Sequence, residues 1–223
     1  MLNMDKWTAV WLCVLIALVY AILSGFWGVV VTDLVQFIIA MFGSIMLAVI
    51  ALNHIGGMET LLDKLSQLMG TDVVHENTLK FIPPVPDAGI TTSTFWESPF
   101  SKFMIYISVM WWSHHGTDGG GYIIQRMSSA KNERHALLAT LWFNLAHYAL
   151  RVWPWVIVAV VSIIMFPIIP ESYAELGTKA GYPLVMNSLL GPGLKGILIV
   201  SFLAAFMSTI DTHLNWGVSY LIN

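Results

Sequence analysis

The chain has 223 residues, of which 57% are hydrophobic and only 10% charged, and its mean hydropathy is +0.73. Soluble globular domains carry about 25% charged residues, so this composition argues against a soluble enzyme and against a disordered segment. Ten Lys and Arg against thirteen Asp and Glu leave a net charge of -3, with no basic surface for a nucleic acid. The single cysteine, Cys13, leaves no disulfide framework and no Cys-based metal cluster. The composition is typical of an integral membrane protein.

Apolar runs long enough to cross a bilayer, which needs about 20 residues, recur along the whole chain. We predict an all-α integral membrane protein, residues 1–223 forming a single unit with about five transmembrane helices. Gly25 separates the first two runs, Ser113–Gly121 interrupts the third, and Pro154 predicts a kink in the fourth. The predicted spans lie at about residues 7–23, 26–53, 100–124, 136–165 and 194–222.

The polar segments predict the orientation. Arg126, Lys131 and Arg134 form the densest basic cluster, which the positive-inside rule places in the cytoplasm. Alternation then places the loops 54–99 and 167–193 outside the cell, together with the N-terminus. Because an outside N-terminus is unusual for a complete protein without a signal, we expect a fragment that lacks earlier helices. Within the first loop, the apolar spacing of Met58–Met69 predicts a short amphipathic surface helix.

Asp33 lies inside the second apolar run. A carboxylate at that depth costs at least ~2.5 kcal/mol on insertion scales, so it needs a partner, a cation or a proton. The alternative is an interfacial aspartate at the cytoplasmic helix end, stabilised by the helix dipole.

The fifth run carries small and hydroxyl side chains on one helical face, with a carboxylate beside it. Oxygen atoms in this arrangement suit a hard cation such as Na⁺, whereas small residues alone would also allow close helix packing. The candidate cation-binding residues are Ala205, Ser208, Thr209, Asp211 and Thr212, together with Asp33.

Three consecutive glycines in the third run predict an unwound stretch, which at membrane depth marks a transporter's solute site. The alternative is that the helix simply ends there. On the fourth run His147 and Arg151 share a face that avoids lipid; His147 could contact solute, and Arg151 could equally snorkel or hold a neighbouring carbonyl. The candidate solute-binding residues are Trp112, Gly119, Gly120, Gly121 and His147.

Several segments resemble the sodium/solute symporter family, in the order and spacing of that family. They are Ser24–Gln36, Gln125–Asn132, Gly181–Pro183, Gly191–Gly196 and Ala204–Asn215. The resemblance implies part of a five-plus-five inverted-repeat transporter fold, with core helices 4 to 8 present in this chain. The family's main sodium site corresponds to Ala205, Ser208 and Thr209. A second sodium site of some members corresponds to Asp33, Asp211 and Thr212, with Ser208 shared, although Asp211 stands where those members carry a hydroxyl.

The same resemblance bears on the solute. His147 occupies the position of a sugar-contacting lysine of the sugar-transporting members, and the third run is richer in glycine than theirs. A sugar, a polyol, an amino acid and an organic anion therefore all remain open as the small polar solute.

We expect Na⁺-coupled symport of such a solute across a cell membrane, most simply a bacterial cytoplasmic membrane. This expectation includes no enzyme activity and no cofactor beyond Na⁺ as coupling ion. The expected partners are the solute and the lipid bilayer, with no nucleic acid. One alternative is an intramembrane metalloenzyme built on His114, His115, Asp118 and His147, although these lack the ligand spacing of known motifs. The other is an inactive, truncated membrane protein.

Overall fold

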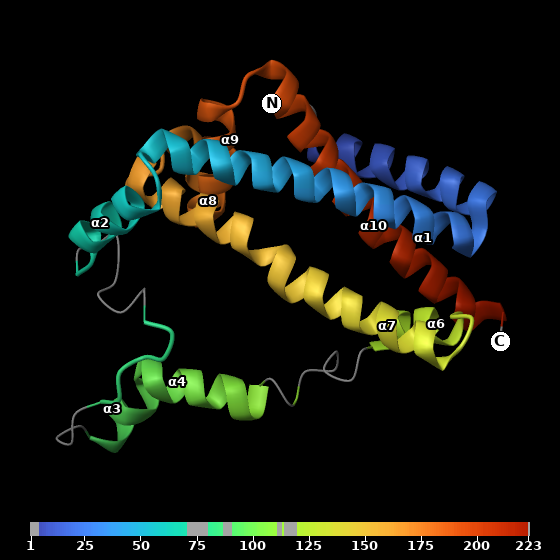
Figure 1. Cartoon of the computed structure of the whole chain (residues 1–223), viewed down its shortest axis with the longest axis horizontal. Coiled ribbons are helices and arrows are strands. Elements are labelled where there is room, and N and C mark those ends of the chain that lie inside the picture. The colour runs from blue at the N-terminus through green and yellow to red at the C-terminus, as the bar shows by residue number, and fades with distance from the viewer. Residues whose placement is uncertain (1–4, 71–79, 87–90, 111–112, 114–119, 223) are drawn as a thin grey trace.

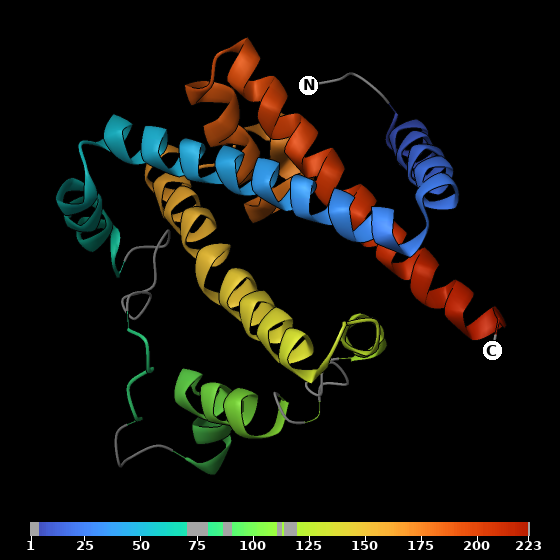
Figure 2. The same ribbon diagram turned by 45° about the vertical axis from the view of Figure 1, so that its right-hand side comes forward.

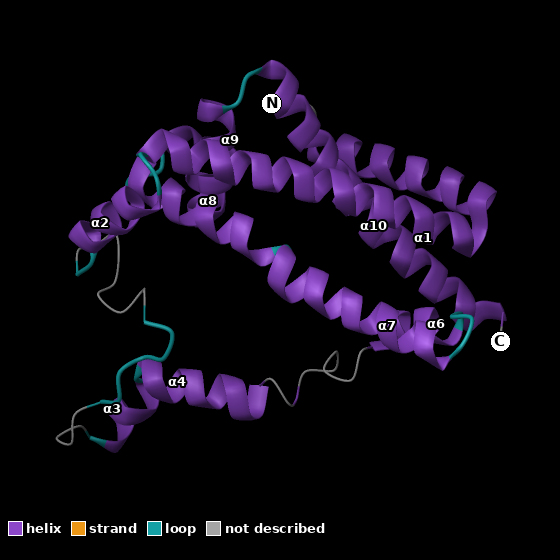
Figure 3. Cartoon of the chain, viewed as in Figure 1, coloured by secondary structure: helices purple, strands orange, loops and turns teal. Residues whose placement is uncertain are grey.

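The computed structural model describes residues 5–70, 80–86, 91–110, 113 and 120–222. The elements in this part of the chain are all helical (Figure 3), as the sequence predicts. The α-helices are α1 (Lys6–Ile55), α2 (Met58–Leu68), α3 (Thr92–Glu97), α4 (Pro99–Ile105), α6 (Gly120–Ser128), α7 (Glu133–Asn144), α8 (Val152–Met165), α9 (Gly181–Leu189) and α10 (Pro192–Ile222). Two π-helices, η1 (Tyr106–Met110) and η2 (Leu145–Leu150), and one 3₁₀-helix, η3 (Glu171–Ala180), connect them.

The first two predicted spans form the two halves of α1. Asp5 caps its start, because Oδ2 accepts hydrogen bonds from the backbone N–H of Trp7 at 3.0 Å and of Thr8 at 3.4 Å. Gly25 has φ 61° and ψ -170°, a conformation that breaks the helix and that glycine adopts most readily. The ribbon reverses direction there (Figure 1), as the predicted break requires.

Within the described residues, three segments are helical, long and apolar enough to cross a membrane: Gly25–Ile55, Glu133–Met165 and Pro192–Leu221. Trp7–Leu23 is a shorter apolar helix. Many large apolar side chains on these helices are exposed, among them Leu23 and Trp27, and a surface of this kind is stable in lipid rather than in water. These helices confirm the predicted class of integral membrane protein.

The predicted third span, 100–124, is not continuous in the described part of the chain. α4 and η1 end at Met110, and the next described helix, α6, begins at Gly120. The predicted interruption at Ser113–Gly121 falls on this gap, most of which lies outside the described residues. The membrane crossing of this segment therefore stays a prediction.

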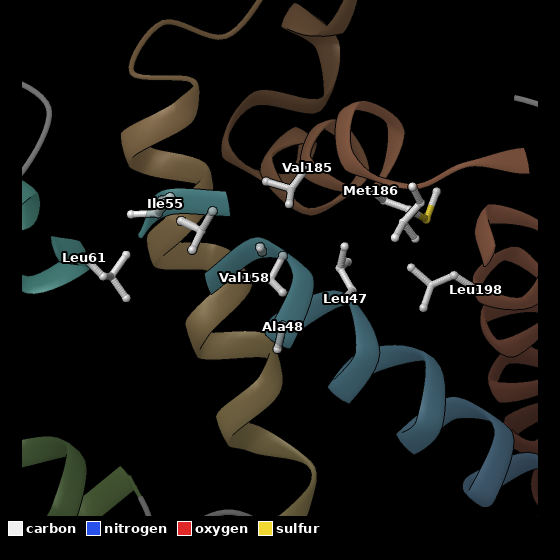
Figure 4. Close-up of a cluster of buried hydrophobic side chains, with 11 residues drawn as sticks. Leu47, Ala48, Ile55, Leu61, Val158, Val185, Met186 and Leu198 are labelled. Carbon is white, nitrogen blue, oxygen red and sulfur yellow. The ribbon is translucent and has the colours of Figure 1, made fainter. Parts of the chain in front are cut away.

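An apolar core joins α1, α2, α8, α9 and α10 at one end of the bundle (Figure 4). Leu47, Val158, Val185 and Leu198 have no exposed surface at all. Burying each such side chain stabilises the fold by about 1.5–3 kcal/mol. Leu61, one of two buried leucines of α2, belongs to the same cluster, which confirms the predicted amphipathic helix.

From this core the helices diverge. In both ribbon views α8 and α7 lead away from α1, while α10 crosses α1 (Figures 1 and 2). The route from α7 to α8 passes through η2, because the ring of Pro154 cannot donate a hydrogen bond to the preceding turn. The indole Nε1 of Trp155 donates to Ser44 Oγ at 3.1 Å and fastens α8 to α1 just beyond the kink. Space for a polar site remains between the diverging helices.

The two ends of the bundle carry the segments that alternation assigns to opposite faces. α6, the start of α7 and the C-terminus lie at one end, and α2 and α9 lie at the other (Figure 1). The basic residues Lys131 and Arg134 belong to the first end, and Lys64 of α2 belongs to the second.

This arrangement predicts the result of cysteine labelling in intact cells. With Cys13→Ser as background, we expect an impermeant maleimide to label Lys64→Cys from outside and Lys131→Cys only after permeabilisation. Both lysines are exposed, so accessibility within the protein does not bias the comparison. The opposite labelling pattern would reverse the orientation, and outside labelling of both would contradict the bundle's two-ended arrangement.

Candidate cation and solute site

Four polar side chains from three helices meet between α1, α6 and α10. Nη2 of Arg126 lies 3.1 Å from Oδ2 of Asp33 and donates to Thr212 Oγ1 at 3.0 Å. The hydroxyl of Ser208 donates a short hydrogen bond to Oδ1, the other oxygen of Asp33. Both carboxylate oxygens therefore have a partner. We call Asp33, Arg126, Ser208 and Thr212 the polar cluster.

The position of Asp33 explains why the cluster forms. It lies eight residues beyond Gly25, about 12 Å along the helix at 1.5 Å per residue. Its side chain is 22% exposed, and that of Arg126 is 31% exposed. The sequence indicated that Asp33 requires a partner, a cation or a proton, and the tertiary structure supplies the guanidinium of Arg126.

Sequence reasoning missed this role of Arg126, which it used only as a marker of the cytoplasmic loop. The available signal was its place two residues after the apolar pair Ile123–Ile124, in the last turn of α6. A charge that follows an apolar segment so closely can reach back into the bundle as easily as outward.

The predicted cation residues of α10 divide into two groups. Ser208 and Thr212, four residues apart, face α1 and join the polar cluster. Ala205 and Thr209 are exposed, and the Thr209 hydroxyl donates to the Ala205 carbonyl at 3.0 Å. Asp211 is completely buried, and its Oδ1 accepts from Asn215 Nδ2 at 3.1 Å. The structure thus brings Asp33, Ser208 and Thr212 into one cluster, and their binding of a cation stays a prediction.

A cavity of about 450 Å³ opens beside the polar cluster. Its walls come from α1, α6, α7, η2, Arg151 and α10, and most of them are apolar. His147 lies in the wall, stacked on Phe143 with ring centroids 5.3 Å apart, and its Nε2 lies 3.3 Å from Nη2 of Arg151. The lining residues are Val30, Asp33, Leu34, Phe37, Ile123, Arg126, Met127, Ala139, Thr140, Trp142, Phe143, Ala146, His147, Arg151, Ser208 and Thr212.

The predicted glycine stretch is described only at its end, because Trp112 and Gly119 lie outside the described residues. Gly120 has a left-handed φ of 60° at the start of α6. A Cβ on Gly121 would lie 2.6 Å from Cε2 of Trp216, so only glycine lets α6 approach α10 this closely. This close approach helps to bring Arg126 to Asp33. The solute-binding role of these residues stays a prediction.

A metal centre has no support in the described part of the chain. No group of three or more His, Cys, Asp or Glu side chains that could hold a metal ion occurs among the described residues. His114, His115 and Asp118, on which the metalloenzyme alternative depends, lie outside them.

Comparison with known proteins identifies the type of protein that the chain resembles. The model of the Sodium:solute symporter family matches residues 1–223. The mouse protein named Sodium/glucose cotransporter 1 is 30% identical over 237 residues, which cover 96% of this chain and 34% of that protein. Solute carrier family 5 member 4 of the rat is 26% identical over 96% of this chain and 34% of its own length.

A third relative, the bovine Sodium/mannose cotransporter SLC5A10, is 25% identical over 90% of this chain and 35% of its own length. The chain therefore spans about a third of the length of the curated relatives it matches. No solved structure matches the chain. By their names these relatives are transporters rather than enzymes, which agrees with the expectation from the sequence.

The close contact of α6 with α10 predicts that a methyl group added at Gly121 destabilises the protein. Gly121→Ala should displace Trp216 and lower the thermal stability of the purified protein by about 1–3 kcal/mol. Gly217→Ala is the matched control on α10, because a Cβ there meets nothing within 4 Å. Equal melting temperatures for the two variants would contradict the contact.

The ion pair predicts a second stability effect. Arg126→Gln leaves the Asp33 carboxylate without its cation and should cost about 1–3 kcal/mol in thermal unfolding in detergent. The double variant Asp33→Asn with Arg126→Gln removes both charges and should recover part of that loss. Arg134→Gln, which removes an exposed charge, serves as control. If Arg126→Gln melts like the control, the ion pair does not stabilise the fold.

Proposed function

Because the chain belongs to the sodium:solute symporter family, we propose that the protein carrying it couples Na⁺ movement to uptake of a small polar solute across a cell membrane. The names of its relatives, sodium cotransporters of glucose and mannose, support this proposal. The polar cluster beside the cavity is the observation that carries it, because Asp33 is a charged residue within a membrane-spanning helix, and such residues mark an ion or substrate path.

Asp33, Ser208 and Thr212 are the proposed ligands of one Na⁺. Hard cations prefer oxygen ligands. The Ser208 hydroxyl contacts the Asp33 carboxylate, and the Thr212 hydroxyl shares Nη2 of Arg126 with that carboxylate. Two further oxygens support the assignment. Oε1 of Gln36, one turn beyond Asp33, and Oε1 of Gln125 are buried without a hydrogen-bond partner among the described residues. Buried acceptors of this kind normally have a donor or an ion.

In this arrangement the guanidinium of Arg126 occupies the place that we propose for Na⁺. Its guanidinium neutralises Asp33 and also holds Thr212, so an entering Na⁺ would compete with Nη2 for the same two oxygens. Releasing Arg126 frees the last turn of α6, whose residues also line the cavity. Ion binding and the shape of the solute cavity would thereby be coupled, because Na⁺ favours the state in which Arg126 no longer contacts Asp33 and Thr212.

The main sodium site that the resemblance assigns would share Ser208 with this site and add Ala205 and Thr209, whose own contact is the hydrogen bond from the Thr209 hydroxyl to the Ala205 carbonyl. Ala205 and Thr209 are exposed in this chain, so a further helix of the family fold would complete the shell. Asp211 remains a proposed member of the second site through its place one turn after Ser208. Each site then takes part of its ligands from α10, which makes that helix the link between the two ions.

The proposal predicts a specific loss of Na⁺ dependence. Ser208→Ala should raise the Na⁺ concentration for half-maximal uptake about tenfold, since a lost ligand worth about 1.4 kcal/mol changes affinity by that factor. Solute uptake at saturating Na⁺ and expression should change little. The measurement is Na⁺ activation of uptake in the transporter that carries this chain, with ²²Na⁺ binding to the purified protein as a second readout.

Ser188→Ala is the control, because among the described residues the Ser188 hydroxyl bonds to backbone carbonyls of its own helix, those of Leu184 and Val185. An unchanged Na⁺ activation curve for Ser208→Ala would remove Ser208 from the cation site. Uptake that is independent of Na⁺ in the unaltered protein would defeat the proposed function as a whole.

A further inference from the structure

Arg151 is a charged residue in the middle of a membrane-spanning segment. It stands eighteen residues after Glu133 and fourteen before Met165 in the span Glu133–Met165. The sequence has no other Lys, Arg, Asp or Glu between Arg134 and Glu171. A cation at mid-membrane depth is costly and is retained where it serves a partner or a pathway, so its partner has to be found.

No carboxylate of the described residues is that partner. Nη2 of Arg151 lies 3.3 Å from His147 Nε2, and the guanidinium carbon lies 5.2 Å from the ring centre of Trp155. Its Nε is buried and has no hydrogen-bond acceptor within the described part of the chain. The one ion pair recorded there joins Arg126 to Asp33. Indole and imidazole position the guanidinium without neutralising it.

The cavity that Arg151 borders consequently carries a net positive charge. Asp33 and Arg126, which also line it, cancel one another. Arg151 adds one uncompensated positive charge to walls that are otherwise mostly apolar. In such a low-dielectric surrounding an anion is attracted far more strongly than in water.

Arg151 and His147 also offer hydrogen-bond donors to this side of the cavity. A guanidinium donates and never accepts, so the contact with Arg151 makes His147 Nε2 the acceptor and leaves Nδ1 as the donor of a neutral ring. Both residues thus offer donors to a ligand. A carboxylate, which only accepts and matches the guanidinium fork, fits this pair of donors. The acceptors that sugar hydroxyls also need lie elsewhere in the lining, on Asp33 and Thr140 among others.

The backbone next to Arg151 is also irregular. η2 (Leu145–Leu150) is a π-helix, and the N–H of Arg151 bonds to the Ala146 carbonyl at 3.0 Å, one residue further back than in an α-helix. Pro154 follows within the next turn. Short π-helical turns are frequent at functional sites, and here one brings His147 and Arg151 to the same wall.

We propose that the solute cavity takes a small organic carboxylate, held through its carboxylate by Arg151 with His147 as second donor. The inference rests on the proposed transport function and narrows its solute class. The cavity of about 450 Å³ has room for a carboxylate with a compact apolar or aromatic body against Phe37, Trp142 and Phe143. The proposed carboxylate solute differs from glucose and mannose, the sugars in the names of the relatives.

Ligand binding to the purified full chain in lipid nanodiscs tests the proposal. The probes are lactate and phenylacetate, their neutral amides lactamide and phenylacetamide, and glucose, each followed by saturation-transfer NMR and calorimetry. We expect both carboxylates to bind at least about tenfold more tightly than their amides, and glucose to bind no better than the amides. This comparison needs no variant and is unaffected by folding defects.

Three variants locate the binding. Arg151→Gln should weaken both carboxylates about tenfold or more and leave the amides unchanged, and Arg151→Lys should retain part of the affinity. Arg134→Gln, an equal loss of charge at an exposed position of α7, should change nothing. Circular dichroism and melting curves establish that each variant is folded.

Preferential binding of glucose, equal binding of acids and amides, or undiminished carboxylate binding by folded Arg151→Gln would each overturn the proposal. Repeating the titrations in NaCl and in KCl separates it from the proposed function. Carboxylate binding with no response to Na⁺ in binding or uptake would defeat Na⁺ coupling alone, whereas Na⁺-driven uptake of glucose would defeat the carboxylate assignment alone.

Discussion

The cost of placing a carboxylate among membrane-spanning helices organises the polar half of this molecule. Asp33 has both oxygens occupied, one by Arg126 and the other by Ser208. These partners come from α6 and α10, so one charge on α1 determines where two other helices can lie. The glycine at position 121 belongs to the same constraint, because it allows α6 to approach the Trp216 indole of α10.

The apolar core and the polar cluster lie at opposite ends of the bundle. At the core end, the fully buried Leu47, Val158 and Leu198 belong to one apolar cluster that joins α1, α8 and α10. At the other end the same helices diverge, and polar side chains and a cavity occupy the space. Such a division suits the proposed transport function, in which a well-packed end would support a site whose occupant and charge balance change.

The cavity contains two different cationic environments. Arg126 is neutralised by Asp33, whereas Arg151 rests against the rings of His147 and Trp155. The first arrangement suits exchange with an entering cation and the second suits an anionic ligand. Coupling between ion and solute, as proposed here, requires both to influence one element, and we propose the last turn of α6, which reaches both the polar cluster and the cavity, for this role.

The sequence alone determined the membrane class, the break at Gly25, the amphipathic helix Met58–Met69 and the distortion near Pro154. These features follow from local hydrophobic period and from backbone chemistry that each residue carries with it. It also identified Asp33 as a residue needing a partner and Ser208 and Thr212 as oxygen donors on one face. Both inferences depend only on the cost of a charge in lipid and on the helical repeat of 3.6 residues, which are the same in every fold.

Only the tertiary structure decided which partner Asp33 takes and which face of α10 meets α1. The pairing of Arg126 with Asp33 joins residues 93 positions apart, and no local pattern encodes such a distance. The division of Ser208 and Thr212 from Ala205 and Thr209 likewise depends on the rotation of α10 in the bundle. That rotation results from packing against Leu47 and its neighbours. The sequence alone therefore predicts which residues of α10 lie on one face, but not which of them point toward α1.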